Sequence, residues 1–247
     1  MLVVNSVSKS YQSFEALHRV TFQLQFGDVV GLLGLNGAGK STLLKGLAGV
    51  LPFTSGEVRL GKADSSLELQ KLVGYQPERP CLAPSLTVHQ QIKTVEEIYG
   101  LDRAVRSQRR KELIELLSLQ SLLHVPCGEL SKGELQRVGF LLSTIHSPKL
   151  LLLDEPMSGL DPKQMLAFRK FIHAEKKERI TILSTHLLQE VQAVCNKLLI
   201  LTEGQLTTFK EDLSGESLSH LENYFLQVIP GGKSRTDSEE TKIVNAP

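Results

Sequence analysis

The sequence predicts an α/β fold with a mixed, mainly parallel sheet core, an N-terminal antiparallel β subdomain and an inserted helical subdomain. Three patterns support this prediction. A glycine-rich loop at 34–42 links an apolar, strand-like segment to a helical pattern. Apolar segments at 150–154 and 179–184 flank a helical pattern, as parallel strands joined by a crossover helix do. Between about 77 and 147, helical periodicity replaces the strand patterns.

The first 60 residues contain short segments with strand-like patterns. These segments lie at 2–7, 20–26, 29–33 and 58–60. The segment at 29–33 runs directly into the glycine-rich loop and belongs to the parallel core. The other three are expected in the antiparallel subdomain.

Helices and strands alternate after this region. In the inserted lobe, Leu113, Leu116 and Leu117 recur at helical spacing. Asp161 is expected to cap a helix that has Pro162 at its first position. The apolar faces expected for this helix and the next are Met165, Phe168 and Ile172, then Leu187, Leu188, Val191, Val194 and Cys195.

The C-terminal part is expected to hold a strand at 197–202, a turn at 203–205 and a short helix at about 218–229. We therefore predict one domain over 2–230, with the helical subdomain at about 79–147. The polar stretch at 231–247 is expected to be a disordered tail, because it cannot bury enough apolar surface to fold.

Net charge, cysteine content and the lengths of the apolar runs indicate which partners and which cellular compartment to expect. The formal net charge is +1, from 28 Lys and Arg against 27 Asp and Glu, so no bulk field favours nucleic acid or an anionic membrane. Three widely spaced cysteines, Cys81, Cys127 and Cys195, suggest neither a disulfide framework nor a zinc site. No apolar run approaches the roughly 18 residues of a membrane span, and no secretory signal is visible. We expect a soluble, cytoplasmic protein.

The loop at 34–42 has the pattern of a phosphate-binding loop. Its residues are Gly34, Leu35, Asn36, Gly37, Ala38, Gly39, Lys40, Ser41 and Thr42. Glycines let the backbone wrap an anion with its N–H groups pointing inward, and the following helix adds the positive end of its dipole. Lys40 is expected on the β- and γ-phosphates of a nucleoside triphosphate, and the Ser41 hydroxyl on magnesium (Mg²⁺).

A second acidic element follows the apolar run at 150–153. Asp154 and Glu155 stand at the expected carboxyl end of a buried strand, where open α/β sheets bind ligands. Asp154 is expected to hold Mg²⁺, and Glu155 to polarise an attacking water. The alternative is an ordinary acidic turn after a strand. The presence of a phosphate-binding loop in the same chain favours the metal-binding interpretation.

These motifs, with others in the expected order, resemble the ATP-binding cassette (ABC) ATPase family over about 2–208. The signature peptide of that family is matched by Ser131, Lys132, Gly133 and Glu134 after Leu130. The resemblance implies that this segment acts on ATP bound to a partner subunit. It also implies that Tyr11 stacks on adenine, that His186 contacts the γ-phosphate, and that Asp161 belongs to the D-loop, which couples the two sites.

Two of these motifs also have a purely structural reading. Ser131 and Glu134 have the spacing of a capping box at the start of an amphipathic helix. We hypothesise that Ser131 caps its own helix in the single subunit and contacts phosphate when two subunits close. Asp161 can likewise act both as helix cap and as D-loop residue.

The sequence departs from the family pattern at three positions. Lys132 replaces the first signature glycine, and Glu134 replaces the usual glutamine. In the Q-loop, Glu78 stands at the glutamine position, while Gln76 lies two residues earlier. We favour Glu78 as the residue that couples the helical lobe and senses Mg²⁺, with Gln76 as the alternative.

The resemblance implies an ATP- and Mg²⁺-dependent hydrolase that works as a homodimer, because this chain holds one set of motifs. It implies a separate integral membrane permease as partner, with this subunit on the cytoplasmic face of the membrane. The signature and the segments at 74–78 and 221–226 are similar to exporters paired with the type-two ABC permease.

Two other classes of function remain as alternatives. The first is a non-transport ABC ATPase that acts on DNA or ribosomes. Its best support is the basic run at 103–111, although Glu112 and Glu115 follow at once and favour a solvated helix face. No nucleic-acid partner is therefore expected. The second is a small-molecule kinase, which shares the phosphate-binding loop but needs neither a signature helix nor His186.

Overall fold

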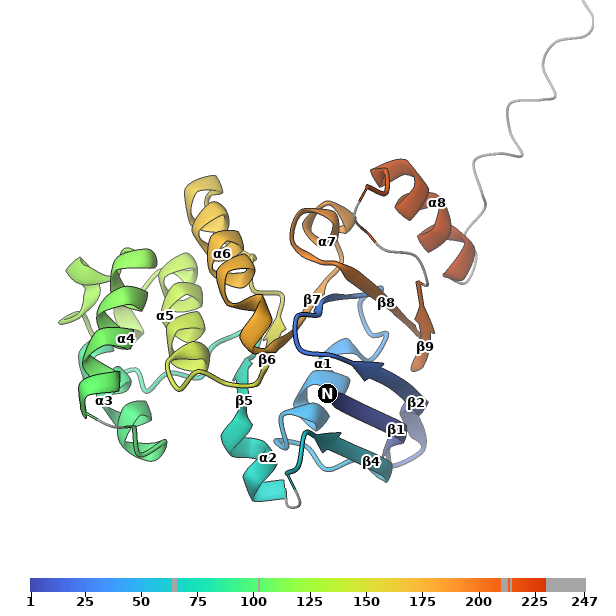
Figure 1. The fold of residues 1–247 in the computed structure, drawn as a ribbon, viewed down its shortest axis with the longest axis horizontal. Coiled ribbons are helices and arrows are strands. Elements are labelled where there is room, and N and C mark those ends of the chain that lie inside the picture. Colours follow the sequence, from blue (N-terminus) through green and yellow to red (C-terminus); the bar gives the residue numbers. More distant parts are fainter. Residues whose placement is uncertain (64–65, 102, 210–212, 214, 230–247) are drawn as a thin grey trace, which may run out of the picture.

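The computed structural model describes residues 1–63, 66–101, 103–209, 213 and 215–229 (Figure 1). The tail expected at 231–247 lies outside these residues. None of the helices in the described part of the chain is long and apolar enough to cross a bilayer.

An antiparallel sheet forms the N-terminal subdomain, as predicted. Its order is β2 (Phe14–Leu24), β1 (Leu2–Tyr11) and β4 (Ser55–Leu60). Strands β1 and β2 form a hairpin that ends with Tyr11 opposite Phe14. Both strands of the hairpin are longer than the segments that predicted them, because pairing continues through mixed polar and apolar residues towards the turn.

The second sheet has six strands and holds the parallel core. Its order is β5 (Val73–Gln76), β6 (Leu150–Asp154), β7 (Ile180–Thr185), β3 (Val29–Leu33), β8 (Lys197–Thr202) and β9 (Gln205–Thr208). All neighbours pair in parallel except β8 and β9, which are antiparallel. Strands β3, β6 and β7 are buried along their whole length, which explains their continuous apolar sequences.

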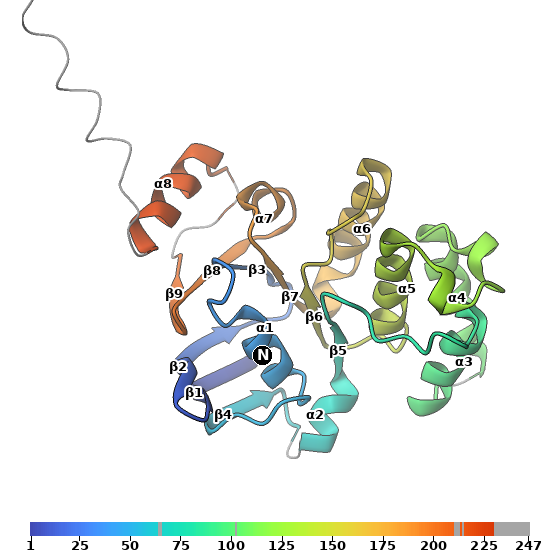
Figure 2. The same cartoon turned by 180° about the vertical axis from the view of Figure 1, so that it is seen from behind.

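Helices cover both faces of this sheet. They are α1 (Lys40–Leu47), α2 (Ser66–Leu72), α3 (Val88–Ile98), α4 (Arg103–Leu116), α5 (Lys132–Thr144), α6 (Pro162–Glu175), α7 (Leu188–Val194) and α8 (Leu218–Val228). Single 3₁₀ turns occur at Gln120–Leu122, Cys127–Glu129 and Lys176–Glu178. In both views, α3, α4 and α5 form a lobe that lies on the opposite side of α6 from the N-terminal sheet (Figures 1 and 2).

Side chains of the buried strands point alternately to the two faces of the sheet, and a separate hydrophobic core lies on each face. Leu150 and Leu152 of β6 pack with α1 and the N-terminal sheet, whereas Leu151 and Leu153 face the cluster that includes the helical lobe. Because successive side chains of a strand point to opposite faces, one short leucine run serves both clusters. Two residues of the predicted face of α6, Phe168 and Ile172, are buried in the cluster that includes the helical lobe, whereas Met165 is only half-buried and lies outside it.

The start of α7 differs from the prediction. Leu187 was expected on the apolar face of this helix, but it precedes the first turn as N-cap and its side chain is 48% exposed. Val191 and Val194 are buried as expected. The helix has seven residues, and its buried face begins after Leu187 rather than at Leu187.

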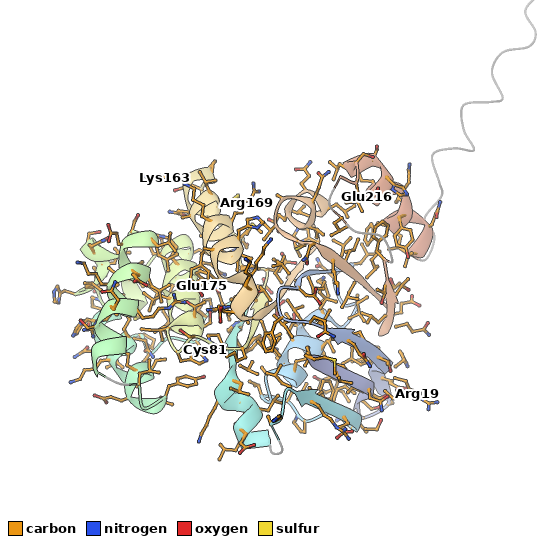
Figure 3. The ribbon with its side chains drawn as sticks, in the orientation of Figure 1. Arg19, Cys81, Lys163, Arg169, Glu175 and Glu216 are labelled. Carbon is orange, nitrogen blue, oxygen red and sulfur yellow. The ribbon has the colours of Figure 1, made fainter. Side chains whose placement is uncertain are left out.

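An ionic cluster joins the helical lobe to the core. Glu175, at the end of α6 and labelled in Figure 3, accepts hydrogen bonds from Arg109 of α4 and from Arg179, which precedes β7. Both guanidinium groups also lie over the Phe171 ring, at 5.3 and 5.5 Å from its centroid. Burial lowers the pKa of Arg179, and the Glu175 carboxylate opposes that shift.

The structure corrects the interpretation of the basic run at 103–111 as a solvated helix face for Arg109 and Arg110, whereas Lys111 is exposed as expected. The side chain of Arg109 is 16% exposed and paired with Glu175. Arg110 pairs with Glu96 of α3, whose side chain is 2% exposed. Two arginines of the run therefore neutralise carboxylates inside the molecule, and they are not available as an open phosphate-binding surface.

His146 lies where the helical lobe meets the central sheet. Its ring stacks on Tyr99 with centroids 3.8 Å apart, and its Nε2 atom lies 3.1 Å from the backbone oxygen of Val73. Burial lowers the pKa of His146 from 6.5 to about 4, despite the bond to Val73. The folded protein therefore holds this imidazole neutral under conditions where the unfolded chain protonates it.

We predict a pH-dependent stability from this residue. Between pH 6.5 and about 4, the unfolded chain binds a proton that the folded chain does not, so stability falls as the pH is lowered through this window. From pH 7 to 5, the free energy of unfolding of the wild type should fall by about 2 kcal/mol more than that of a His146→Gln variant. Denaturant unfolding at several pH values measures this difference. If the free energies of unfolding of the two proteins changed equally with pH, the lowered pKa of His146 would be contradicted.

Candidate nucleotide-binding site

The phosphate-binding loop lies between β3 and α1, at the carboxyl edge of the parallel sheet. The chain leaves β3 at Leu33 and enters α1 at Lys40. Gly37 and Gly39 have φ values of 83° and 105°, which favour glycine. These conformations let the loop close into a concave turn at the N-terminus of α1. Backbone N–H groups in such a turn favour an anion.

Lys40 is the buried cation of this loop. Its side chain turns back into the turn, and Nζ donates to the backbone oxygens of Gly34 at 2.7 Å and Leu35 at 3.2 Å. Burial lowers the pKa of Lys40, while the carboxylates of Glu155, Asp154 and Glu78 oppose this shift. The ammonium group is thus placed between loop carbonyls and an acidic edge.

The acidic edge is built from the ends of two adjacent parallel strands. Asp154 ends β6 opposite Ser184 of β7. The Ser184 hydroxyl donates to Oδ1 of Asp154 at 2.5 Å and accepts from the backbone N–H of Glu155 at 3.0 Å. Asp154 is 3% exposed, so its carboxylate is fixed by hydrogen bonding. Ser184 was expected only as part of a strand.

Glu155 and His186 are brought together directly. Glu155 has a φ of 48°, in the left-handed region that L-residues rarely adopt. Its Oε1 atom lies 3.0 Å from Nδ1 of His186. The side chain of His186 is 57% exposed, whereas that of Glu155 is 17% exposed. Backbone strain of this kind is common at functional sites, and the Glu155 carboxylate lies against the imidazole.

The loop and the acidic edge line one open cavity of about 540 Å³. Its lining residues are Tyr11, Phe14, Ala16, Asn36, Gly37, Ala38, Gly39, Lys40, Ser41, Thr42, Glu78, Asp154, Glu155, Ser158 and His186. Gly34 and Leu35 were also predicted as binding residues, but they do not line it. They act through their carbonyls, which hold Lys40.

Two aromatic residues stand at one end of this cavity. Tyr11 is 44% exposed and Phe14 is 62% exposed, and they pair across the β1–β2 hairpin. Sequence reasoning identified Tyr11 but missed Phe14. A large apolar residue three positions after Tyr11, directly after a two-residue turn, was the available signal. Together they offer an exposed aromatic surface for a planar base.

The structure separates the two Q-loop candidates. Glu78 lines the cavity, whereas Gln76 is 1% exposed and does not. Nε2 of Gln76 donates to both the backbone and side-chain oxygens of Gln136 in α5. Gln136 in turn donates to the backbone oxygen of Glu78 at 2.6 Å. Sequence reasoning missed Gln136, because its partners lie about 60 residues away along the chain.

The signature segment does not line this cavity. Ser131 caps α5 in the predicted capping box, with its Oγ donating to Oε2 of Glu134 at 2.7 Å. Hydrogen bonds from Ser131 lower the pKa of Glu134. Asp161 caps α6 as predicted, and Gln164 completes a capping box that was not predicted. Lys132 contacts Ser158, one of the cavity residues.

The cavity has the groups that Mg²⁺ and a nucleoside triphosphate require. A buried lysine contacts the loop carbonyls, and the hydroxyl of Ser41 and the carboxylates of Asp154 and Glu78 are hard oxygen donors that line the same cavity. Magnesium at phosphate sites is held by one or two such carboxylates together with substrate oxygens and waters. The donor set therefore fits this metal. The cavity volume lies in the range of small-molecule sites.

The fold and this site define a nucleotide-binding α/β protein with a phosphate-binding loop. The sequence profile of the family described as ABC transporter matches residues 17–158. The chain belongs to this family, as an ATP-binding domain.

Relatives and solved structures agree with this membership. The uncharacterised ABC transporter ATP-binding protein YxlF of Bacillus subtilis is 34% identical over 84% of this chain and 70% of its own length. The lantibiotic transport ATP-binding protein SrtF of Streptococcus pyogenes is 35% identical over 90% of this chain and 96% of its own. An ATP-binding subunit of an ABC transporter superposes with a TM-score of 0.83 at 30% identity, over 91% of this chain and 99% of that one.

A more distant structure shares the fold. It is a dimeric bacterial ABC transporter cassette bound to ADP and Pi, with a TM-score of 0.74 at 23% identity, over 85% of this chain and 100% of that one. In the human ABC sub-family A member 10, 35% identical over 93% of this chain, the matched region is 15% of that protein.

We predict that Lys40→Ala weakens binding of Mg·ATP by roughly 10- to 100-fold, because a charge-assisted contact to phosphate is lost from a partly desolvated site. Lys45→Ala is the matched control, since Lys45 is exposed on the same helix. Titration calorimetry with Mg·ATP measures both variants. Equal affinities for the two would contradict the placement of the phosphates.

Proposed function

We propose that this chain is the ATP-hydrolysing subunit of an ABC transporter, with Mg·ATP bound in the cavity between the phosphate-binding loop and the acidic edge. The observation that supports it best is the joint placement of Lys40, Asp154, Glu155 and His186 on one cavity. Tyr11 and Phe14 would hold the adenine at the other end. A kinase would use the loop but has no need of the pair formed by Glu155 and His186.

In this proposal the side chains of the cavity divide phosphate binding, metal binding and proton transfer among them. Lys40 leaves its loop carbonyls to bind the β- and γ-phosphate oxygens. Ser41, Asp154 and Glu78 would hold Mg²⁺, which supplies charge neutralisation on the phosphates. Glu155 accepts a proton from the attacking water as general base, and His186 keeps that carboxylate oriented and contacts the γ-phosphate.

A second copy of the chain completes the site. The start of α5, with Ser131 and the signature N–H groups, lies outside the chain's own cavity. A helix N-terminus is an anion site, so a two-fold arrangement of two copies can bring it to the partner's γ-phosphate. Breaking the bond between Ser131 and Glu134 frees the hydroxyl for that contact. The fold shared with a dimeric cassette supports this arrangement.

We predict that Glu155→Gln binds ATP but lowers turnover at least about 100-fold, because the general base is removed while the phosphate contacts remain. The variant should accumulate as an ATP-bound dimer. Size-exclusion chromatography with light scattering, with and without Mg·ATP, measures this state. Glu115→Gln, an exposed residue of α4, should behave like the wild type. A Glu155→Gln chain that stays monomeric with saturating ATP would contradict the scheme.

The transported substrate would be handled by a separate integral membrane permease. Gln136 links the backbone of Glu78, at the cavity, to α5 in the helical lobe, so closure around ATP can move the lobe that docks on the permease. Relatives named as transport subunits support this role. The subunit would then lie on the cytoplasmic face of the membrane, and the type-two exporter group is the subclass we favour.

We expect the full-length chain, tagged and expressed in a cell that encodes its permease, to copurify with an integral membrane protein after detergent extraction. Mass spectrometry identifies the partner, and an unrelated tagged ATPase is the control. Recovery of nucleic acid in a salt-sensitive complex instead would favour the non-transport alternative. Against that outcome stand the ion pairs of Arg109 and Arg110.

A further inference from the structure

One contact connects the signature segment to the chain's own cavity. Nζ of Lys132, the first residue of α5, donates a hydrogen bond to Oγ of Ser158 at 2.8 Å. Ser158 lines the nucleotide cavity, whereas Lys132 does not. The backbone N–H of Ser158 also donates to the oxygen of Glu155 at 3.2 Å. A continuous path of hydrogen bonds thus runs from the start of α5 to the strained residue of the acidic edge.

Close packing accompanies this hydrogen bond. A Cβ atom added to Gly133 would lie 2.7 Å from the backbone oxygen of Gly159, so the two backbones are in direct contact. Gly159 has a φ of 82°, and a Cβ there would lie 3.4 Å from the side-chain carbons of Lys132. The aliphatic part of Lys132 therefore covers the turn at Gly159 before its ammonium group reaches Ser158.

Lys132 makes a contact that the usual residue at this position cannot. The ABC signature pattern has glycine there, and glycine has neither a donor nor a side chain to cover the turn. The contact is therefore a property of this sequence. The D-loop turn and the start of α5 are held together by a charged hydrogen bond as well as by the approach of Gly133 to Gly159.

We propose that Lys132 is a positioning residue that makes the start of α5 and the turn at Ser158 move as one unit. The inference rests on the proposed function, in which the signature segment serves the ATP of a second chain. Nucleotide in one cavity then acts through Ser158 and Lys132 on the signature presented to the other cavity. The two ATP sites of the dimer are coupled, and binding at one favours closure at the other.

A different role for the same cation is direct attraction of the partner's phosphate. In that role Ser158 is irrelevant, and loss of the Lys132 charge weakens ATP binding without changing the dependence of one site on the other. The two roles differ in whether Ser158→Ala reproduces the effect of Lys132→Met. They also differ in whether the effects of the two substitutions add.

The first test measures the contact in the nucleotide-free chain, independently of any dimer. Hydrogen exchange of the amides at 157–160 should be roughly 5- to 10-fold faster in Lys132→Met than in the wild type. Lys132→Arg, which keeps the donor, should retain most of the protection. Lys163→Met removes an exposed lysine at the start of α6 and is the matched charge control. Unchanged exchange in Lys132→Met would overturn the proposal.

The second test measures the coupling itself. ATPase rates of the full chain are recorded against Mg·ATP concentration for the wild type, Lys132→Met, Ser158→Ala and the double variant. The Hill coefficient of the wild type should exceed about 1 and fall towards about 1 in all three variants, equally in the double and the singles. Lys132→Arg should restore it. An effect of Lys132→Met that Ser158→Ala lacks, or a wild type without cooperativity, would overturn the proposal.

Failure of the proposed function gives a separate result. If the wild type neither hydrolyses ATP nor dimerises with it, both the function and the coupling fall. If the wild type hydrolyses ATP and dimerises with it, and the variants have the same Hill coefficient as the wild type, only the proposed role of Lys132 is overturned.

Discussion

The hydrogen bonds of Ser184 are the constraint on which the site depends. One hydroxyl holds the Asp154 carboxylate and the Glu155 N–H, and so fixes the ends of β6 and β7 against each other. Because these strands pair in register, Asp154 and Glu155 face the loop that follows β3 at the same edge of the sheet. The burial of Lys40 and the orientation of Glu155 towards His186 both require that edge to be fixed.

Two hydrophobic cores hold this edge from both faces of the sheet, and the helical lobe shares one of them. Leu150 and Leu152 anchor β6 to α1 and the N-terminal sheet, and Leu151 and Leu153 anchor it to the lobe side. Polar contacts also connect lobe and site, among them the bonds between Gln76, Gln136 and Glu78. Polar bonds of this kind can exchange partners at a smaller cost than a packed leucine core.

Local sequence explains which parts of this arrangement could be predicted. The phosphate-binding loop, the acidic strand end and the helix caps Ser131 and Asp161 depend on neighbours within a few residues. Strands β5 and β9 are only four residues long and were missed. Gln136 and the ion pair of Arg109 were missed because their partners lie 60 and 66 residues away. The assigned roles of the site residues remain predictions.

The ionic cluster at Glu175 has a mechanical consequence. Arg179 precedes β7, so the cluster lies at the amino edge of the sheet, whereas the nucleotide cavity lies at the carboxyl edge. Through Glu175, Arg109 therefore anchors the helical lobe at the amino edge of the sheet, opposite the edge that holds the nucleotide cavity. A rotation of the lobe about this anchor has its smallest amplitude at the amino edge of the sheet, and at the opposite edge it shifts the start of α5 together with the turn at Ser158 that Lys132 contacts.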